Sequence, residues 1–217
     1  MLGSTKGAQM ASNRSHARSF VGLLLGASLL GSLAAAPAVG ATTRSTAPTS
    51  SATALTTTTI DRPWYTTELF YLGLVNCTRT GGWVLSDGTC RGYGSGHYST
   101  YVRPLTYAPG FSNVVARPYA KLLAVRNVCS HYYYGDPGYR LRRAGYYSYI
   151  WGENIGCRDG YASAKAAVLA SHLVFQGEKS SNGGHWRNIK NSRFAWIGIG
   201  IWRYGSRTRL VTDFYHP

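Results

Sequence analysis

The chain has 217 residues, a length that suits one full-sized domain with extensions, and 44% of its residues are hydrophobic. This composition excludes a wholly disordered or collagen-like chain. Lys and Arg number 23 against 8 Asp and Glu, which gives a formal charge of +15, and the four cysteines form an even set. Cationic surfaces and oxidised thiols are typical of extracellular proteins, so we expect the protein to be secreted.

The first 41 residues have the pattern of a secretory signal peptide. Lys6, Arg14 and Arg18 precede an uncharged apolar run over residues 20–36, and Val39-Gly40-Ala41 supplies small residues for cleavage. The alternative is a transmembrane anchor, but a run of about 17 residues is shorter than the roughly 20 that a spanning helix needs. No later apolar stretch approaches that length, so we predict no membrane span in the mature chain.

Residues 42–63 are predicted to be a flexible linker, because Ser and Thr dominate them and they contain little that a core could bury. Residues 64–217 then form the folded domain. The signal peptide removes three positive charges and no acid, so the mature chain keeps its basic balance. Its arginines are spread along the chain without a nucleic-acid-binding motif, and we therefore expect no nucleic acid as partner.

The first half of the domain is predicted to be helical, with one long loop. Residues 67–77 place Leu69, Leu72 and Val75 at helical spacing, with Glu68 in the first turn. Residues 78–104 are glycine-rich and form a loop. A second helix over 112–129 contains Pro118. Either the helix starts near residue 117 with this proline in its first turn, or it bends there.

The second half combines two more helices with a hairpin. Residues 139–145 form a short helix that ends at a glycine, and Ser163 caps a stronger helix over 163–176. In the second of these, His172 follows the apolar side and is interpreted as a core histidine. Isoleucine and glycine then alternate in the run 194–204, and a turn leads into 209–215, which predicts an antiparallel hairpin. Helices and a hairpin with one core imply an α+β fold.

Four short runs in this domain carry a more specific pattern. They are Asn127-Val128-Cys129-Ser130-His131, Gly152-Glu153-Asn154-Ile155-Gly156, Gly184-His185-Trp186-Arg187-Asn188-Ile189 and Ile197-Gly198-Ile199-Gly200. In this order and spacing they resemble the CAP superfamily, which comprises the cysteine-rich secretory proteins, antigen 5 and pathogenesis-related 1 proteins and whose domain is also called the SCP domain. The resemblance extends over about residues 65–216, nearly the whole domain.

The resemblance implies a three-layer α-β-α sandwich with a mostly antiparallel central sheet. The middle strands of such a sheet are not evident from periodicity, and residues 146–150, which lead into Gly152, are the best candidate for one. The resemblance also implies a protein without an established catalytic activity. We expect a monomer.

The family's central cleft commonly holds two histidines and two acidic residues. By motif position these are His131, Glu153 and His185, with Asp136 as the fourth, although Asp136 stands in a turn-forming string that offers its own explanation. Imidazole and carboxylate ligands suit a divalent metal, most plausibly zinc. In the alternative interpretation, the two histidines are hydrogen-bonded residues that brace the loops around the cleft.

An enzymatic interpretation would need a nucleophile or an activated water. Ser130 neighbours His131, but no G-x-S-x-G elbow and no H-E-x-x-H pattern is present. We therefore expect no catalytic residue and favour an extracellular binding module, which engages an anionic envelope polymer, a lipid or a protein. The rival is a metal-dependent hydrolase that acts on cell-wall or peptide substrates through His131, Glu153 and His185.

Four cysteines allow three disulfide pairings. We expect Cys77 to pair with Cys90, which would fasten the glycine-rich loop to the end of the first helix. Cys129 would then pair with Cys157 and join the segment of His131 to the segment of Glu153.

Overall fold

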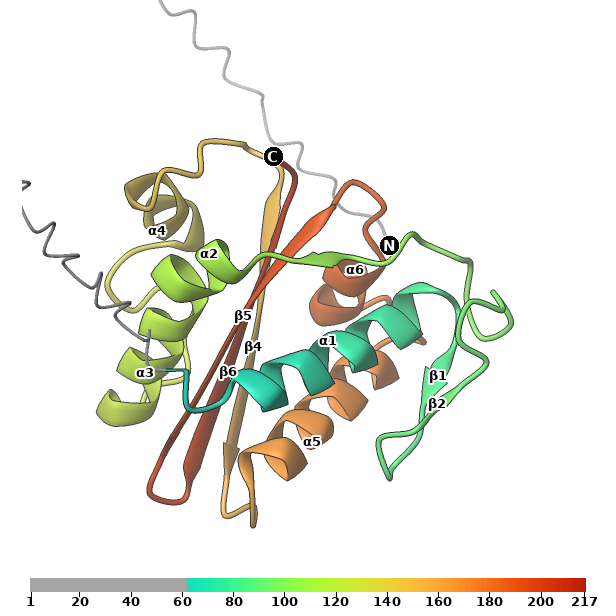
Figure 1. Ribbon diagram of the computed structural model, residues 1–217, viewed down its shortest axis with the longest axis horizontal. Helices are drawn as coiled ribbons and strands as arrows, with labels where there is room; N and C mark the ends of the chain where they lie inside the picture. Colours follow the sequence, from blue (N-terminus) through green and yellow to red (C-terminus); the bar gives the residue numbers. More distant parts are fainter. Residues whose placement is uncertain (1–61) are drawn as a thin grey trace, which may run out of the picture. The chain divides into compact units, whose positions relative to one another are not determined.

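The computed structural model describes residues 62–217; the predicted signal peptide and nearly all of the predicted linker lie outside them. The described chain forms three layers, with a central sheet covered by helices on both faces (Figure 1). The predicted α+β, α-β-α sandwich is therefore confirmed. Among residues 62–217, no helix combines the length and the apolar character that crossing a membrane requires.

The central sheet has four strands in the order β3-β5-β6-β4. Strand β3 (Thr106–Tyr107) runs parallel to β5 (Trp196–Tyr204), and β6 (Arg207–Tyr215) pairs antiparallel with both β5 and β4 (Trp151–Asp159). The sheet is thus mostly antiparallel, and the predicted C-terminal hairpin is confirmed as β5 and β6.

Strand β4 corrects the prediction for residues 146–150, which form no strand. The strand begins at Trp151, where the backbone meets Tyr215 at the end of β6. Tyr147 and Tyr149 are 71% and 89% exposed, so the aromatic character of this segment does not mark a buried strand. The Gly152–Gly156 run itself is the edge strand of the sheet.

Helices α1 (Tyr65–Arg79), α5 (Ala164–Gly177) and α6 (Gly184–Lys190) cover one face of the sheet (Figure 1). The α5 helix begins as predicted, because the Ser163 hydroxyl accepts a hydrogen bond from the Ala166 amide at 3.1 Å. The predicted apolar side of α1 is confirmed at Val75, which is fully buried, and at Leu72, which packs on the core, but not at Leu69, which is 40% exposed. Tyr71 and Leu74 are buried as well. The main core lies between these helices and the isoleucines of β5.

The opposite face is covered by α2 (Pro109–Phe111), the π-helical turn η1 (Ser112–Ala116), α3 (Arg117–Arg126) and α4 (Pro137–Arg143). Here the glycines of β5 let a helix approach closely: a side chain at Gly200 would collide with the Ala116 backbone at 2.2 Å, and one at Gly198 with the Phe111 ring at 2.8 Å. The alternation of isoleucine and glycine thus places bulk on one face and a helix backbone on the other.

Pro118 lies in the first turn of α3, directly after the π-helical turn. The longer i to i−5 hydrogen-bond spacing of that turn accommodates the missing proline donor within a continuous helical segment. Both alternatives from the sequence are therefore partly realised, because α3 starts at residue 117 and the helical segment nevertheless begins upstream.

Both expected disulfides are present, Cys77–Cys90 and Cys129–Cys157. The first fastens α1 to a small hairpin formed by β1 (Trp83–Val84) and β2 (Cys90–Arg91) within the predicted 78–104 loop, whose first two residues belong to α1. The second ties the segment after α3 to strand β4. The short helix predicted over 139–145 is α4, and its C-terminal neighbour Gly145 has a positive φ of 88°.

Candidate functional site

A cleft of about 540 Å³ opens at edge strand β4. Its walls come from the loop before α4, from the start of β4 and from α6. The residues that line it are His131, Tyr132, Asp136, Pro137, Trp151, Gly152, Glu153 and Asn188. Three of the four predicted site residues, His131, Asp136 and Glu153, are therefore brought together at one opening.

Glu153 is the centre of this cleft, and both of its oxygens are engaged. Oε1 lies 2.7 Å from Nδ1 of His131, and Oε2 accepts a hydrogen bond from Arg140 at 2.5 Å. The Glu153 side chain is only 1% exposed, whereas that of His131 is 37% exposed. Each oxygen of this buried carboxylate is therefore held by its own partner.

Arg140 connects the cleft to the rest of its layer. Besides Glu153, its guanidinium donates to the carbonyls of His131 at 2.9 Å and Gly135 at 2.6 Å. It also lies over the Tyr119 ring, 3.5 Å from the ring centroid. This arginine fixes the loop of His131 against the carboxylate that His131 contacts.

Asp213 lies beside Glu153 on the neighbouring strand, directly opposite it in the register of β4 and β6. The residue is 1% exposed, and neither carboxyl oxygen has a hydrogen-bond donor among the described residues. Burial, followed by the adjacent Glu153, raises the pKa of Asp213 well above its ordinary value. Burial therefore favours the neutral form of the Asp213 carboxyl.

His185 lies on the other side of β4, on α6. Its Nδ1 is 2.6 Å from Oε1 of Glu178, and its ring stacks on Phe175 with 4.2 Å between centroids. Partial burial acts to raise the pKa of Glu178, but the hydrogen bonds from His185 outweigh it and the pKa is lowered. His185 therefore has a carboxylate partner of its own, distinct from Glu153.

Two asparagines connect the sides of the strand. Asn154 follows Glu153 in β4 and its side chain points to α6, where it donates to the His185 carbonyl at 3.1 Å. Asn188 donates to the Glu153 carbonyl at 3.1 Å and to the Asn154 side chain at 2.8 Å. The two histidines thus belong to one network but face different layers, and no three His, Cys, Asp or Glu side chains within 62–217 lie close enough to hold a metal ion.

Asp136 and Ser130 have local structural roles. The Asp136 carboxylate caps α4 by accepting from the Tyr139 amide at 2.9 Å, while it also lines the cleft. The Ser130 hydroxyl accepts from the Tyr132 amide at 3.1 Å. Among residues 62–217, no histidine ring is hydrogen-bonded to the Ser130 hydroxyl.

Three site residues, Arg140, Glu178 and Asp213, were not identified from the sequence. Asp213 carried a usable signal. It shares one face of the predicted strand with Val211 and Tyr215 and so occupies a core position. Arg140 and Glu178 gave none, because neither belongs to a motif run and Arg140 is one of three arginines in its short helix.

No family model and no curated protein sequence matches the chain. Among solved structures it is similar to an extracellular protein containing an SCP domain from Bacillus anthracis strain Ames, with 22% identity and a TM-score of 0.43 over 54% of this chain and 35% of that one. It is also similar to NaASP2 with Zn²⁺, with 15% identity and a TM-score of 0.41 over 68% of this chain and 78% of that one. The chain spans about a third of the length of the first protein.

Proposed function

We propose that the chain is a secreted CAP-domain protein that acts as a non-enzymatic binding module and uses the cleft at β4. The motif runs that resemble this superfamily support the proposal, because three of them supply cleft residues: His131, Glu153 and Asn188. Runs that are distant in sequence converge at one opening, which is the arrangement expected when they share a function.

The observation that carries the binding role is the burial of Glu153, whose side chain is only 1% exposed. A general base or a metal ligand must reach the substrate proton or the metal ion with an accessible oxygen. Both Glu153 oxygens are already held, by His131 and by Arg140. The cleft therefore offers a fixed, charge-balanced surface with an accessible imidazole edge, which suits recognition better than proton transfer.

The lining suggests a hydroxyl-rich envelope polymer as the ligand. Tyr132 is 73% exposed and Trp151 is half-buried, so the cleft presents aromatic surface for stacking on sugar rings. Asn188 and His131 add groups that can hydrogen-bond to hydroxyls. The domain's basic balance would attract the anionic polymers of an envelope.

Co-sedimentation of the purified protein with insoluble peptidoglycan tests this function. We expect Tyr132→Ala to reduce the bound fraction at least fivefold. Tyr149→Ala is the matched control, because Tyr149 is 89% exposed and does not line the cleft, and it should bind as wild type does. Equal binding by both variants would contradict the proposal, and release of soluble fragments from the peptidoglycan would favour the hydrolase.

The expected zinc ion fits this cleft only in part. Each histidine presents Nδ1 to a carboxylate, an arrangement that leaves Nε2 as a metal donor and is common in metal sites. Zinc takes three or four protein ligands, however, and His185 lies on α6 beside Glu178 while Glu153 is held by His131 and Arg140. The residues as arranged do not form a three-ligand centre, and no step of the proposed function passes through a metal.

Calorimetry with zinc at pH 7.5 separates the two expectations. A shared centre requires that His131→Ala and His185→Ala each abolish the binding heat. The arrangement described above predicts that neither variant differs from wild type by more than about twofold in affinity, because the two imidazoles act separately. Loss of binding in both variants would show that the cleft rearranges around the ion.

A further inference from the structure

A pocket of about 640 Å³ opens beside α6, apart from the cleft at β4. We call it the α6 pocket. Its walls come from the segment 99–102, from the turn between α5 and α6, and from α6 and the residues after it. The lining residues are Ser99, Thr100, Tyr101, Val102, Lys179, Asn182, Trp186, Lys190 and Ser192. None of them lines the cleft at β4, so the two sites are distinct.

The two lysines of the α6 pocket are held in place by neutral oxygens. The Lys190 ammonium group lies within 3.1 Å of four of them, the carbonyls of Thr78, Arg79 and Thr100 and the hydroxyl of Ser99. Lys179 donates to the Tyr98 carbonyl. These contacts orient the ammonium groups, but no partner carries a negative charge that would cancel theirs.

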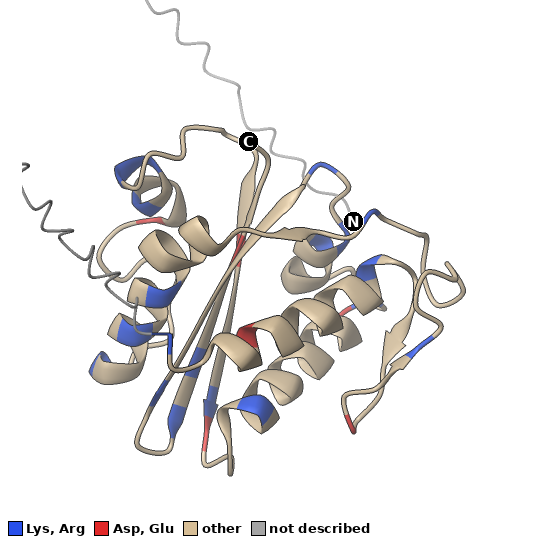
Figure 2. Cartoon of the chain, viewed as in Figure 1, with Lys and Arg blue, Asp and Glu red and all other residues tan. Residues whose placement is uncertain are grey.

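The positive charge of this region has no acidic counterpart. Arg79, at the end of α1, is fully buried, and its guanidinium donates to four backbone carbonyls, those of Arg103, Ile189, Asn191 and Phe194. None of the five ion pairs within 62–217 includes Arg79, Lys179 or Lys190. No Asp or Glu lines the pocket. Figure 2 shows Lys and Arg both at the end of α1 and in α6.

The pKa values reflect this uncompensated charge. Burial, followed by the charges of Arg79 and Lys179, lowers the pKa of Lys190 from 10.5 to about 8. Burial also lowers the pKa of Arg79 to about 10. A bound anion would favour the charged form of Lys190 and offset the repulsion among the three cations.

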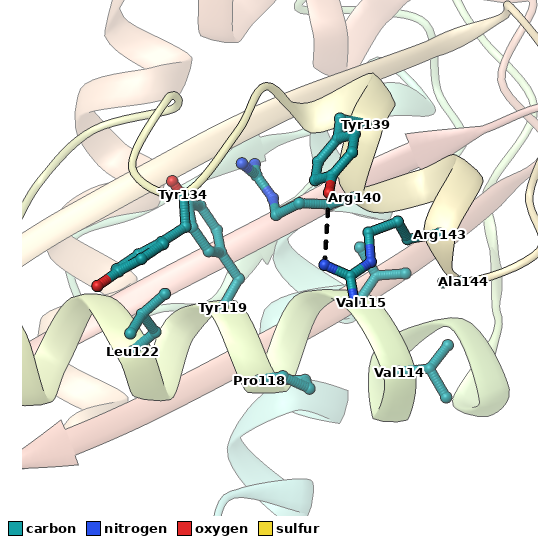
Figure 3. Close-up of a pocket in the computed structure, with 10 residues that line it drawn as sticks. All are labelled: Val114, Val115, Pro118, Tyr119, Leu122, Tyr134, Tyr139, Arg140, Arg143 and Ala144. Atoms are coloured by element: carbon teal, nitrogen blue, oxygen red, sulfur yellow. Dashed lines mark hydrogen bonds between the residues drawn. The ribbon is translucent and has the colours of Figure 1, made fainter.

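The pocket between α3 and α4, shown in Figure 3, is a useful contrast. Of its two arginines, Arg140 lies 2.5 Å from the Glu153 carboxylate and Arg143 is exposed to solvent. A cation that is already paired or hydrated gains little from a further anion. The α6 pocket differs, because Arg79 and Lys190 are wholly or partly removed from solvent and neither is paired with an acid.

The remaining walls of the α6 pocket suit a sugar. Tyr101 is 53% exposed and presents an aromatic face for stacking on a sugar ring. Asn182, Ser99 and Ser192 supply amide and hydroxyl groups that can hydrogen-bond to sugar hydroxyls. The volume lies within the range of small-molecule sites.

We propose that the α6 pocket binds a sugar phosphate monoester, with the phosphate at Lys179 and Lys190 and the sugar ring against Tyr101. Ammonium groups act as point charges that suit phosphate, whereas a carboxylate gains most from the fork of an arginine. The inference goes beyond the proposed function, because it concerns a second pocket and a small ligand. Either can fail without the other.

Calorimetry of the purified protein with glucose 6-phosphate, at pH 7 and low ionic strength, tests the proposal. We expect saturable binding with one site. Glucose lacks the charge and glucuronate replaces the phosphate by a carboxylate, so each should bind at least tenfold more weakly. Inorganic phosphate should bind about fivefold more weakly, because it lacks the ring that stacks on Tyr101.

Matched variants locate the phosphate and the sugar separately. Lys179→Gln should weaken glucose 6-phosphate binding at least fivefold, whereas Lys165→Gln, the same charge change at an exposed residue of α5 outside the pocket, should change it less than twofold. Tyr101→Ala should weaken glucose 6-phosphate binding about fivefold but leave that of inorganic phosphate within twofold. Tyr93→Ala, at a residue of the same loop that is 58% exposed and outside the pocket, should change neither. Circular dichroism verifies that each variant is folded.

The titration of Lys190 gives an independent readout. The charged groups that act on it are Arg79 on α1 and Lys179 in the turn before α6. Saturating glucose 6-phosphate should raise the pKa of Lys190, which nuclear magnetic resonance of the lysine Cε signals follows directly. By linkage, the affinity should fall at least threefold between pH 7 and pH 9, as Lys190 loses its proton.

Three results would overturn the proposal. Equal weakening by Lys165→Gln and Lys179→Gln would indicate non-specific attraction to a basic chain. Equal affinity for glucuronate and glucose 6-phosphate would remove the preference for phosphate. An unchanged pKa of Lys190 at saturating glucose 6-phosphate would place the phosphate outside the α6 pocket.

Discussion

The two histidine–carboxylate pairs on either side of β4 have nearly the same length, 2.7 Å for His131–Glu153 and 2.6 Å for His185–Glu178, but they stand in different surroundings. The Glu153 side chain is 1% exposed and the Glu178 side chain 25%. Glu153 uses its second oxygen for Arg140, whereas Glu178 uses its second oxygen for the His185 amide at the start of α6. The same kind of pair therefore joins the segment between α3 and α4 to strand β4 in the first case and caps a helix in the second.

Because the two hydrogen bonds are alike, burial of the carboxylate should determine how much the free energy of unfolding falls when each pair is lost. A buried charge that loses its partner has no water to replace it, while a surface charge is resolvated. Variants at Glu153 and Glu178 therefore test this role of burial directly.

The largest effect is expected for Glu153→Ala. It leaves Arg140, whose side chain is 12% exposed, without its carboxylate, and removal of one member of a buried pair costs about 3–5 kcal/mol. Urea denaturation followed by circular dichroism measures the free energy of unfolding. Arg143→Ala, on the same helix but exposed, is the control and should cost about 0.5 kcal/mol or less. A loss below about 1 kcal/mol for Glu153→Ala would mean that the lone Arg140 is readily hydrated.

The second-largest effect is expected for loss of the Cys129–Cys157 disulfide. This disulfide ties the His131 segment to β4, whereas no disulfide joins the segments of the His185–Glu178 pair. Its loss in Cys129→Ser/Cys157→Ser should cost about 3 kcal/mol in the chain-entropy model. The other disulfide closes a shorter loop and should cost a similar amount. Nuclear magnetic resonance distinguishes them: the His131 ring signals should shift in the first variant and stay in Cys77→Ser/Cys90→Ser. Unchanged His131 signals in both would show that Arg140 alone orders the loop.

The sequence predicts most of what is locally encoded. The cap at Ser163, the hairpin of β5 and β6 and both disulfides follow from residue types, spacing and the family resemblance. His172 was correctly interpreted as a core histidine: it is fully buried beside Thr78, and burial lowers its pKa to about 3.

The predictions that were wrong or missing depend on tertiary contacts. The aromatic run 146–150 has strand-like residues, yet β4 starts at Trp151 because only there does β6 offer a partner. Leu69 matches the helical period of α1 but is exposed, since the sheet contacts a neighbouring stripe of that helix. Glu68 lies in the first turn of α1 as expected, but its burial and its pairing with Arg117 were not predicted. The pairing of His185 with Glu178 depends on how the turn between α5 and α6 folds, which no motif records.

A smaller effect is expected for Glu178→Ala. The carboxylate accepts from the His185 amide at 2.9 Å as well as from the His185 ring, so the variant loses an acceptor at the start of α6. Because Glu178 is partly solvated, the cost should be about 1 kcal/mol, typical of a lost cap. Urea denaturation again provides the measurement, with Glu178→Gln expected to retain part of the stability through its amide oxygen. A cost equal to that of Glu153→Ala would contradict the role assigned to burial.

The smallest effect is the pH dependence of the exposed pair. The pKa of Glu178 is lowered in the folded protein from an ordinary value of 4.5, so the folded state binds fewer protons than the unfolded state in this range. Its contribution to stability is therefore present above pH 4.5 and is lost as the pH falls through the lowered value. The fold is acid-sensitive in any case, because the buried His172 must be protonated on unfolding below pH 6.5. The informative quantity is thus the difference between wild type and Glu178→Gln, measured by urea denaturation at pH 6 and at pH 3. Wild type should lose more stability than the variant, by less than about 1 kcal/mol because solvent screens the pair, and parallel losses would show that Glu178 does not titrate with folding.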